Sequence, residues 1–379
     1  MKKWLNLENF LYLTIFLLPS YLIKLSFFGL PTNVLEILIV VALGWAFLKR
    51  SFRNFLKLRF RITVGIILAG LVISTLVNGN YLAGAGIIKG WFVLPIIFAL
   101  IVKNVVPQEK LNNIYLTLYF SGVVFSVVSL AQYFLGRVTF DGRLEGIFNS
   151  PNYLAMYLAP MIIIGVLSIK YQVSSIFKKI SLGVILIVFY LTYSYAAWIA
   201  VGVTLAGTAL LEGEKRINFK KLALVFLAIV VLILAQWNNQ KFVDLRNASE
   251  RSSLNSRVMI WQSAGKTLLG NWLVGIGPGN FQEKYLENQK HFPPYLEWAV
   301  PHPHNLYLAF WLYAGVFGVV GFFALLYVWF KEIAQKEKDM LWRISLGIMV
   351  YILLHGLVDT TYFKNDLACI FWLNFIILL

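Results

Sequence analysis

Long apolar runs recur along almost the whole of this 379-residue chain and are separated by short polar stretches. Many of them have roughly the 17–25 residues that an α-helix needs to cross a bilayer. Spans are predicted at residues 8–27, 33–48, 62–78, 86–102, 111–134, 152–169, 180–194, 196–211, 222–237, 304–330, 343–361 and 366–379. The runs do not alternate apolar and polar residues as membrane β-strands do. The pattern therefore predicts an all-α polytopic membrane protein with about 12 transmembrane helices.

One long polar interval interrupts this pattern, at residues 238–303, between the ninth and tenth predicted spans. It contains a helix-like piece, residues 256–269, followed by a glycine-rich turn, residues 275–279. Helical spacing predicts one apolar face on that piece, made by Val258, Trp261, Leu268 and Leu269. We interpret the interval as a long extracytoplasmic loop that carries short helices. Since no internal repeat or low-complexity linker divides the chain, residues 1–379 are predicted to form a single membrane domain.

Composition and charge agree with a membrane protein. Of the residues, 59% are hydrophobic and 13% are charged, whereas soluble domains have about 25% charged residues. A net charge of +16 would suggest nucleic-acid binding in a soluble protein, but here the basic residues gather in alternate loops. Basic residues mark cytoplasmic loops, so both termini are predicted to be cytoplasmic. The short loops on the outer side keep only Lys24, Arg137, Arg143 and Lys364.

Cysteine and acidic residues bear on metal and redox chemistry. The chain has a single cysteine, Cys369, which excludes an intrachain disulfide, and it lacks the Cys/His spacing of zinc sites. The acidic residues of the predicted outer loops are scattered and form no Asp-x-Asp pair. We therefore expect no metal ion and no other cofactor.

Cationic side chains on the outer side are candidates for phosphate binding. Arg143 and Arg257 fit this role, because a guanidinium group stays charged and offers a planar fork of donors to phosphate oxygens. Lys89 lies a few residues inside the fourth predicted span, where ionisable residues are often functional. Plainer alternatives are a solvated arginine, an ion pair between Arg143 and Glu145, and a lysine that extends its ammonium group to the surface.

His304 is a candidate general base, because imidazole titrates near neutral pH and can take a proton from a hydroxyl group. It lies at the outer start of the tenth predicted span, between Pro303 and Asn305. The plainer alternative is a histidine that caps the helix together with Asn305. His302 competes with His304 for any catalytic role.

His355 and Asp359 are four residues apart on the eleventh predicted span. At that spacing two side chains share one face of a helix. They are expected to form either a structural pair or a pair that orients the active site.

The glycine-rich turn at residues 275–279 resembles a nucleotide-binding loop only in its glycine content. It lacks the Gly-Lys-Ser/Thr ending of a phosphate loop and the strand–helix context of a dinucleotide fold. We expect it to be a tight turn whose backbone closely approaches the membrane surface or a ligand.

Several short motifs follow one another between about residues 140 and 360. They are Arg143-Leu144-Glu145-Gly146 with Pro151-Asn152, Ser256-Arg257 with Trp261, Gly275 to Phe281 with Asn280, His304-Asn305-Leu306, Gly315 with Gly318, and His355 with Asp359. Together with the long loop and the predicted spans, this set resembles the O-antigen ligase and O-antigen polymerase-like superfamily of bacterial envelope glycosyltransferases.

The resemblance implies a metal-independent glycosyltransferase of the bacterial cytoplasmic (inner) membrane. The enzyme would transfer a glycan from undecaprenyl diphosphate to a hydroxyl of a glycan, glycolipid or protein acceptor on the outer face, by an inverting-type attack. Arg257 would clamp the diphosphate and His304 would act as the base. Substrate contacts are then expected from Arg143, Lys89, Asn152, Asn280, Asn305 and Tyr195, with His355 and Asp359 in support.

One position departs from the superfamily pattern. Tyr195 stands where an arginine is usual, in the run Ser194-Tyr195-Ala196. The phosphate contact is then lost, moved to Arg143 or Lys89, or replaced by the tyrosine hydroxyl.

Other functions stay open beside the ligase. A polymerase differs only in its acceptor, a second lipid-linked repeat, and no motif in the chain specifies the acceptor. A flippase or transporter of lipid-linked glycans is disfavoured, because such proteins often show inverted repeats and midplane breaks, whereas the polar features here gather on one face. An inactive scaffold is supported only by Tyr195.

Overall fold

Helices dominate the computed structural model of the chain, which describes residues 6–27, 30–51, 56–171, 176–210, 227, 230–231, 234–246, 252–293 and 300–379. Within these ranges, five helical segments are long and apolar enough to cross a membrane. They are Leu58–Asn78, Tyr81–Val105, Gln108–Phe134, Pro151–Ser168 and Leu306–Ile333, and shorter apolar helices accompany them. The prediction of a helical membrane protein is confirmed at this level. The ninth predicted span, 222–237, lies largely outside the described residues, so the count of twelve spans stays a prediction.

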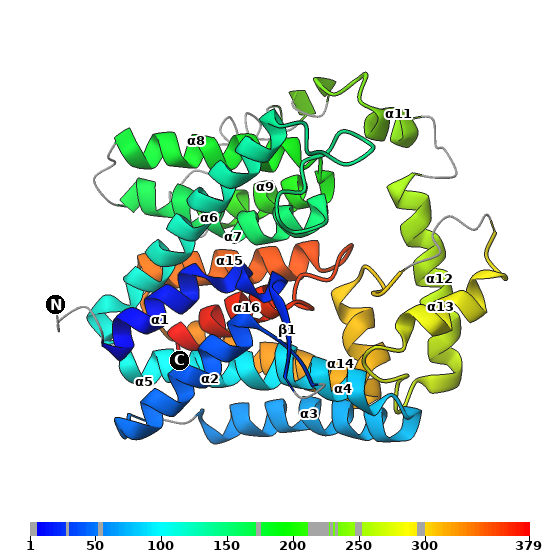
Figure 1. Cartoon of the computed structure of the whole chain (residues 1–379), viewed down its shortest axis with the longest axis horizontal. Coiled ribbons are helices and arrows are strands. Elements are labelled where there is room, and N and C mark those ends of the chain that lie inside the picture. Colours follow the sequence, from blue (N-terminus) through cyan, green and yellow to red (C-terminus); the bar gives the residue numbers. More distant parts are fainter. Residues whose placement is uncertain are drawn as a thin grey trace.

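The described helices agree closely with the predicted spans. In chain order they are α1 (Leu7–Phe16), α2 (Val34–Leu48), α3 (Leu58–Asn78), α4 (Tyr81–Ile87), α5 (Leu94–Val105), α6 (Leu111–Phe134), α7 (Pro151–Tyr171), α8 (Ile176–Leu191), α9 (Tyr195–Leu210), α11 (Gln240–Arg246), α12 (Ser253–Asn271), α13 (Phe281–Gln289), α14 (Leu306–Ile333), α15 (Met340–His355) and α16 (Asn365–Ile377). The apolar helices lie side by side, and α11, α12 and α13 gather beyond one end of the bundle (Figure 1).

The first predicted span is shorter than expected. Helix α1 ends at Phe16, a 3₁₀ turn follows over Leu18–Leu22, and β1 (Lys24–Phe27) pairs with β2 (Leu30–Asn33) in a small antiparallel sheet. Pro19 is the second residue of that turn, and a proline cannot donate the hydrogen bond that would continue the helix. The fold therefore contains one hairpin that the apolar pattern did not predict.

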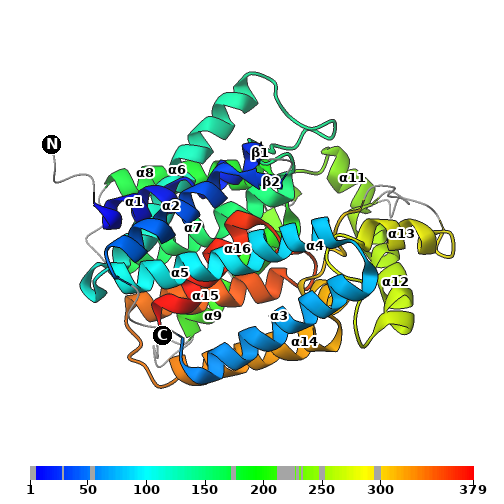
Figure 2. The same cartoon turned by 60° about the horizontal axis from the view of Figure 1, so that its bottom comes forward.

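Helix α14 packs along α3, the most extensive helix pair of the fold, as Figure 2 also shows. Glycines allow the close approach: a Cβ atom on Gly70 would lie 2.6 Å from the carbonyl oxygen of Ala314, and one on Gly321 would lie 2.7 Å from Ile67. Small residues are enriched where membrane helices meet, because they bring the backbones together. This packing fixes α14, and the segment just before this helix carries part of the candidate site.

Candidate functional site

Loops from distant parts of the sequence meet at the end of the bundle where α12 begins. They are the α6–α7 loop with Arg143, the α8–α9 turn with Thr192, the first turns of α12 with Arg257, the segment before α14 with His304, and the turn after α15 with Asp359. A backbone hydrogen bond from Leu144 to Leu191 (2.9 Å) ties the first two together.

Asp359 is the centre of this arrangement. Its carboxylate is 1% exposed, and its two oxygens bind different partners: Oδ1 lies 3.1 Å from His304 Nδ1, and Oδ2 lies 3.3 Å from Arg257 Nη2. The backbone N–H of Thr360 also donates to Oδ1 (2.9 Å). Burial by itself raises the pKa of Asp359, but the charge and hydrogen bond of His304 and the charge of Arg257 outweigh it. The carboxyl pKa therefore lies well below its usual range, and the group is ionised.

His304 is held so that one ring nitrogen is committed to Asp359. An ionised carboxylate can only accept, so the N–H group at Nδ1 donates this hydrogen bond, and in the neutral form of the ring Nε2 carries the lone pair. The side chain is 31% exposed. Its backbone has φ +44°, a left-handed conformation that is uncommon outside glycine and concentrates at functional sites. These features suit a base that takes a proton at Nε2.

The guanidinium group of Arg257 is held in place by two further hydrogen bonds to backbone carbonyl groups. Its Nε donates to the carbonyl oxygen of Val358 (2.7 Å) and its Nη1 to that of Ser253 (3.3 Å). Four residues further along the same helix, Trp261 Nε1 donates to the carbonyl oxygen of His304 (3.2 Å). Helix α12 thus positions both the guanidinium group and the histidine.

Arg143 reaches the same region from the α6–α7 loop. Its Nε donates to the carbonyl oxygen of Thr192 (2.8 Å) and its Nη2 to Asn152 Oδ1 (2.7 Å). Its acidic neighbour is Asp141, 4.0 Å away, rather than Glu145. Burial lowers the pKa of Arg143, Asp141 opposes the shift, and the charge of Arg257 lowers it further. The two guanidinium groups therefore lie within electrostatic reach of each other.

Tyr195 begins α9 at the edge of this region. Its hydroxyl donates to Gln236 Oε1 (2.7 Å), and the ammonium group of Lys241 lies 5.1 Å from its ring centroid. Sequence analysis did not single out Lys241, because a lysine in a polar loop carries no spacing signal. Helix α11 and the turn before α9 bring it to the site.

Lys89, Asn280 and Asn305, which were expected to contact substrate, each make hydrogen bonds or ion pairs with other parts of the protein. Lys89 lies 2.8 Å from Glu36 Oε2 and also donates to the carbonyl oxygen of Pro31 (3.0 Å). Asn280 accepts from Asn80 (2.7 Å) and donates to the carbonyl oxygen of Ile276 (2.7 Å). Asn305 caps α14 by accepting from the N–H groups of Tyr307 and Leu308, and it donates to Leu357. None of these described contacts joins them to Arg143, Arg257 or His304.

Among the described contacts, no hydrogen bond joins the side chains of His355 and Asp359, although the charge of His355 also lowers the pKa of Asp359. Helix α15 ends at His355, so Asp359 lies in the following turn rather than on the same helix face. His355 Nδ1 instead lies 2.8 Å from the Tyr351 hydroxyl, while Asp359 turns to Arg257 and His304. The role of Asp359 in orienting an active site stays a prediction.

His302 and His304 differ in burial: His302 is enclosed, whereas His304 is partly exposed. His302 is 6% exposed, and its Nδ1 lies 2.9 Å from the hydroxyl of Tyr313. Burial, together with the charges of Lys364 and His304, lowers the pKa of His302 to about 3. It is therefore neutral near pH 7 and enclosed, which leaves His304 as the accessible histidine of this segment.

The glycine-rich turn closely approaches the backbone of α14, and the expected approach to the membrane surface or a ligand stays a prediction. Gly275 has φ +76° and Gly315, inside α14, has φ +61°. Ile276 N donates to the carbonyl oxygen of Leu312 (2.7 Å), and Val316 N donates to that of Leu273 (3.1 Å). A Cβ atom on Gly315 would lie 2.1 Å from the same Leu273 oxygen. The turn is thus docked on a kink of α14.

Helix α12 forms as predicted, but only part of its expected apolar face is covered: Leu268 is buried and Trp261 packs against the core. Val258 and Leu269, expected to share its apolar face, are 42% and 84% exposed. The buried residues are Ser256, Met259, Ile260, Ser263, Ala264, Thr267 and Leu268. Small and hydroxyl side chains allow close packing on α13 and α14, which a hydropathy pattern does not register.

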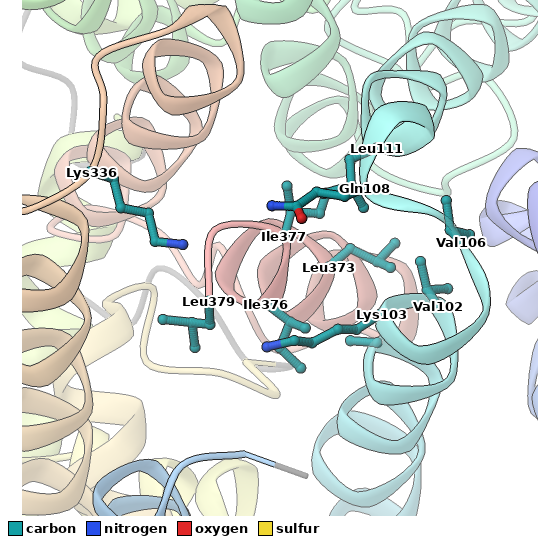
Figure 3. A pocket seen from close by; sticks show the side chains of 11 residues that line it. Val102, Lys103, Val106, Gln108, Leu111, Lys336, Leu373, Ile376, Ile377 and Leu379 are labelled. Carbon is teal, nitrogen blue, oxygen red and sulfur yellow. The ribbon is translucent and has the colours of Figure 1, made fainter. Parts of the chain in front are cut away.

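A cavity of about 240 Å³ lies far from these residues, between the end of α5, helix α16 and the segment after α14. Lys103 and Lys336 line it together with Gln108 and apolar side chains (Figure 3). His304 directly precedes α14 and Lys336 follows it, so the cavity and the loop cluster lie at opposite ends of that helix. This cavity and the candidate chemistry are therefore separate.

A family model described as O-antigen ligase matches residues 180–323, a stretch that includes Tyr195, Arg257 and His304. No curated protein matches the chain.

Proposed function

This chain carries an O-antigen ligase-like domain over residues 180–323, and we propose that it is a metal-independent glycosyltransferase that uses undecaprenyl diphosphate as the carrier of its donor glycan. The family and the apolar helices indicate a bacterial inner-membrane protein of the O-antigen ligase or polymerase type. In the proposal both termini are cytoplasmic, residues 238–303 form a long extracytoplasmic loop, and transfer occurs on the outer face to a glycan, glycolipid or protein hydroxyl.

The observation that carries the proposal is the position of Asp359 between Arg257 and His304. One buried carboxylate contacts both a guanidinium group and an imidazole, and Arg143 lies within electrostatic reach of Arg257. A departing diphosphate gains negative charge as its bond to the sugar breaks. Preorganised cations stabilise such charge strongly when water is excluded, so Arg143 and Arg257 are assigned to the diphosphate.

His304 is assigned to the acceptor. Its Nε2 takes the proton of the acceptor hydroxyl while the oxygen forms a bond to the anomeric carbon of the donor sugar. The bond from that carbon to the diphosphate oxygen breaks at the same time, with inversion, and undecaprenyl diphosphate leaves with the electron pair. Asp359 stabilises the imidazolium that forms, as carboxylates do beside catalytic histidines. The apolar helices provide the bilayer-facing surface for the polyprenyl chain.

The experiment is reconstitution of the protein with a lipid-linked oligosaccharide and an acceptor glycolipid. Arg257→Ala and His304→Ala are expected to abolish release of undecaprenyl diphosphate while the protein still inserts into the membrane. Arg137→Ala and His291→Ala change exposed residues of the same types and should retain transfer. Normal turnover in either site variant would remove that residue from the mechanism.

The products separate the remaining functions. Elongated lipid-linked glycan without acceptor glycolipid identifies a polymerase, in which a second lipid-linked repeat supplies the hydroxyl. Intact lipid-linked glycan moved across the bilayer identifies a flippase. If neither product forms, the protein is a scaffold and the proposed transferase is refuted.

A further inference from the structure

Lys241 lies on α11, at the same end of the bundle as the start of α12 (Figure 1). Its ammonium group donates a hydrogen bond to the carbonyl oxygen of Tyr193 and lies 5.1 Å from the ring centroid of Tyr195. Both contacts satisfy a cation only partly, because a carbonyl dipole and a ring face carry no net charge. Within the described residues, no carboxylate lies in ion-pair contact with Lys241.

The charges around Lys241 are mainly positive. Burial lowers the pKa of Lys241 well below its usual value, and the charges of Arg143 and Arg257 lower it further. Asp141 and Asp359 oppose the shift, but each already faces an arginine, Arg143 and Arg257 respectively. The site thus contains more cationic groups than carboxylate groups.

A buried cation without a partner is costly to the folded protein. Entry of an anionic ligand lowers this free-energy cost, and a ligand with several negative charges lowers it most. A diphosphate has this property, and its several oxygens can accept from donors that approach from different elements. Arg143, Arg257 and Lys241 come from three such elements.

The hydroxyl of Tyr195 does not supply this contact. Its proton is donated to Gln236 Oε1 (2.7 Å), so the hydroxyl has no second proton for a phosphate oxygen. The ring instead supports the ammonium group of Lys241. A cation is therefore present beside position 195, although it comes from a different helix.

We propose that Lys241 is a third cationic ligand of the donor diphosphate, which it contacts after releasing the carbonyl oxygen of Tyr193. This inference rests on the proposed function and adds a binding residue to it. It also gives the site a preference: a lipid diphosphate gains more from a third cation than a lipid monophosphate does.

The experiment measures binding of undecaprenyl diphosphate and undecaprenyl phosphate to the full chain in nanodiscs. Lys241→Met should weaken diphosphate binding by about tenfold to a hundredfold, the worth of a charge-assisted hydrogen bond, and weaken monophosphate binding less. Lys241→Arg should keep most of the affinity. The double variant Tyr195→Arg with Lys241→Met should recover affinity, because it returns a cation to the same place. Lys284→Met, which changes an exposed lysine paired with Glu287, is the matched control.

Thermal unfolding without ligand separates binding from a structural role. Since its charge is buried without a carboxylate partner, Lys241→Met should be at least as stable as the wild type. A clear loss of stability in Lys241→Met with unchanged diphosphate affinity would overturn the inference. Unchanged affinity in Lys241→Met beside a loss in Arg257→Ala would overturn it while the proposed function stands. Absence of diphosphate binding by the wild type would overturn both.

Discussion

The indole N–H of Trp261 donates a hydrogen bond to the carbonyl oxygen of His304, 3.2 Å away. The bond joins α12 to the residue that precedes the capped end of α14. Because Arg257 lies one turn before Trp261 on the same helix, a single helix sets the distance between the phosphate-binding group and the base. His304 holds a left-handed backbone conformation there, and such a conformation persists only where its surroundings enforce it.

Replacing Trp261 by phenylalanine tests this positioning. Trp261→Phe should lower the rate of transfer about tenfold to a hundredfold, because small displacements of a catalytic group are costly, and should lower stability by about 1 kcal/mol. Trp311→Phe removes a similar bond, from Trp311 Nε1 to the carbonyl oxygen of Trp272 (2.8 Å), outside the site. It should cost similar stability and leave transfer intact. Equal rates in the two variants would contradict a positioning role.

Asp359→Asn removes the charge between Arg257 and His304 while keeping the size of the side chain. The amide does not stabilise an imidazolium and can hold the ring in the wrong tautomer, so turnover should fall at least about a hundredfold. Asp141→Asn, which changes a carboxylate 4.0 Å from Arg143, should cost less. Both are measured as rates of undecaprenyl diphosphate release. Wild-type turnover in Asp359→Asn would refute the assigned role.

The buried His302 predicts a pH dependence of stability. Its folded pKa, lowered to about 3, lies below the value of about 6.5 expected in the unfolded chain. The unfolded state then binds the proton more readily, so the stability contribution is complete above about pH 6.5 and is lost as the pH falls toward 3. At pH 5 the loss amounts to about 2 kcal/mol.

His302→Gln isolates that contribution, because glutamine does not titrate and can still hydrogen-bond to Tyr313. The difference in unfolding temperature between pH 7.5 and pH 5, in detergent, should be smaller in His302→Gln than in the wild type. Identical differences in the two proteins would show that His302 is not buried as described.

The docked turn predicts a strong effect of adding one methyl group. Gly275→Ala and Gly315→Ala place a Cβ atom 2.5 Å and 2.1 Å from backbone oxygen atoms at positive φ angles, so each should destabilise by about 2 kcal/mol or more. Gly265→Ala is the control, because a Cβ atom there meets nothing within 4 Å and alanine favours helix. Thermal unfolding in detergent measures all three. Equal stability in Gly275→Ala and Gly265→Ala would contradict the docking.

The apolar pattern by itself determined most helices of this protein, since a helix in a bilayer needs a continuous apolar length and little else. Helices α1, α2, α6, α7, α9, α14 and α16 begin within two residues of the predicted spans. Residue chemistry made Arg143, Arg257 and His304 candidates, because few side chains bind phosphate or titrate near pH 7. The same pattern missed the hairpin after α1 and the end of α15 at His355, where local backbone bonding rather than hydropathy decides.

Tertiary structure alone decided which of these side chains meet. Arg257 and Asp359 are 102 residues apart in the chain, and Arg143 reaches them from a third segment, so no local spacing encodes the cluster. Packing also pairs Lys89 with Glu36, buries His302 and places the ammonium group of Lys241 over the ring of Tyr195. The period of a helix fixes neighbours three or four positions away, whereas a converging site depends on how distant helix ends are held against one another.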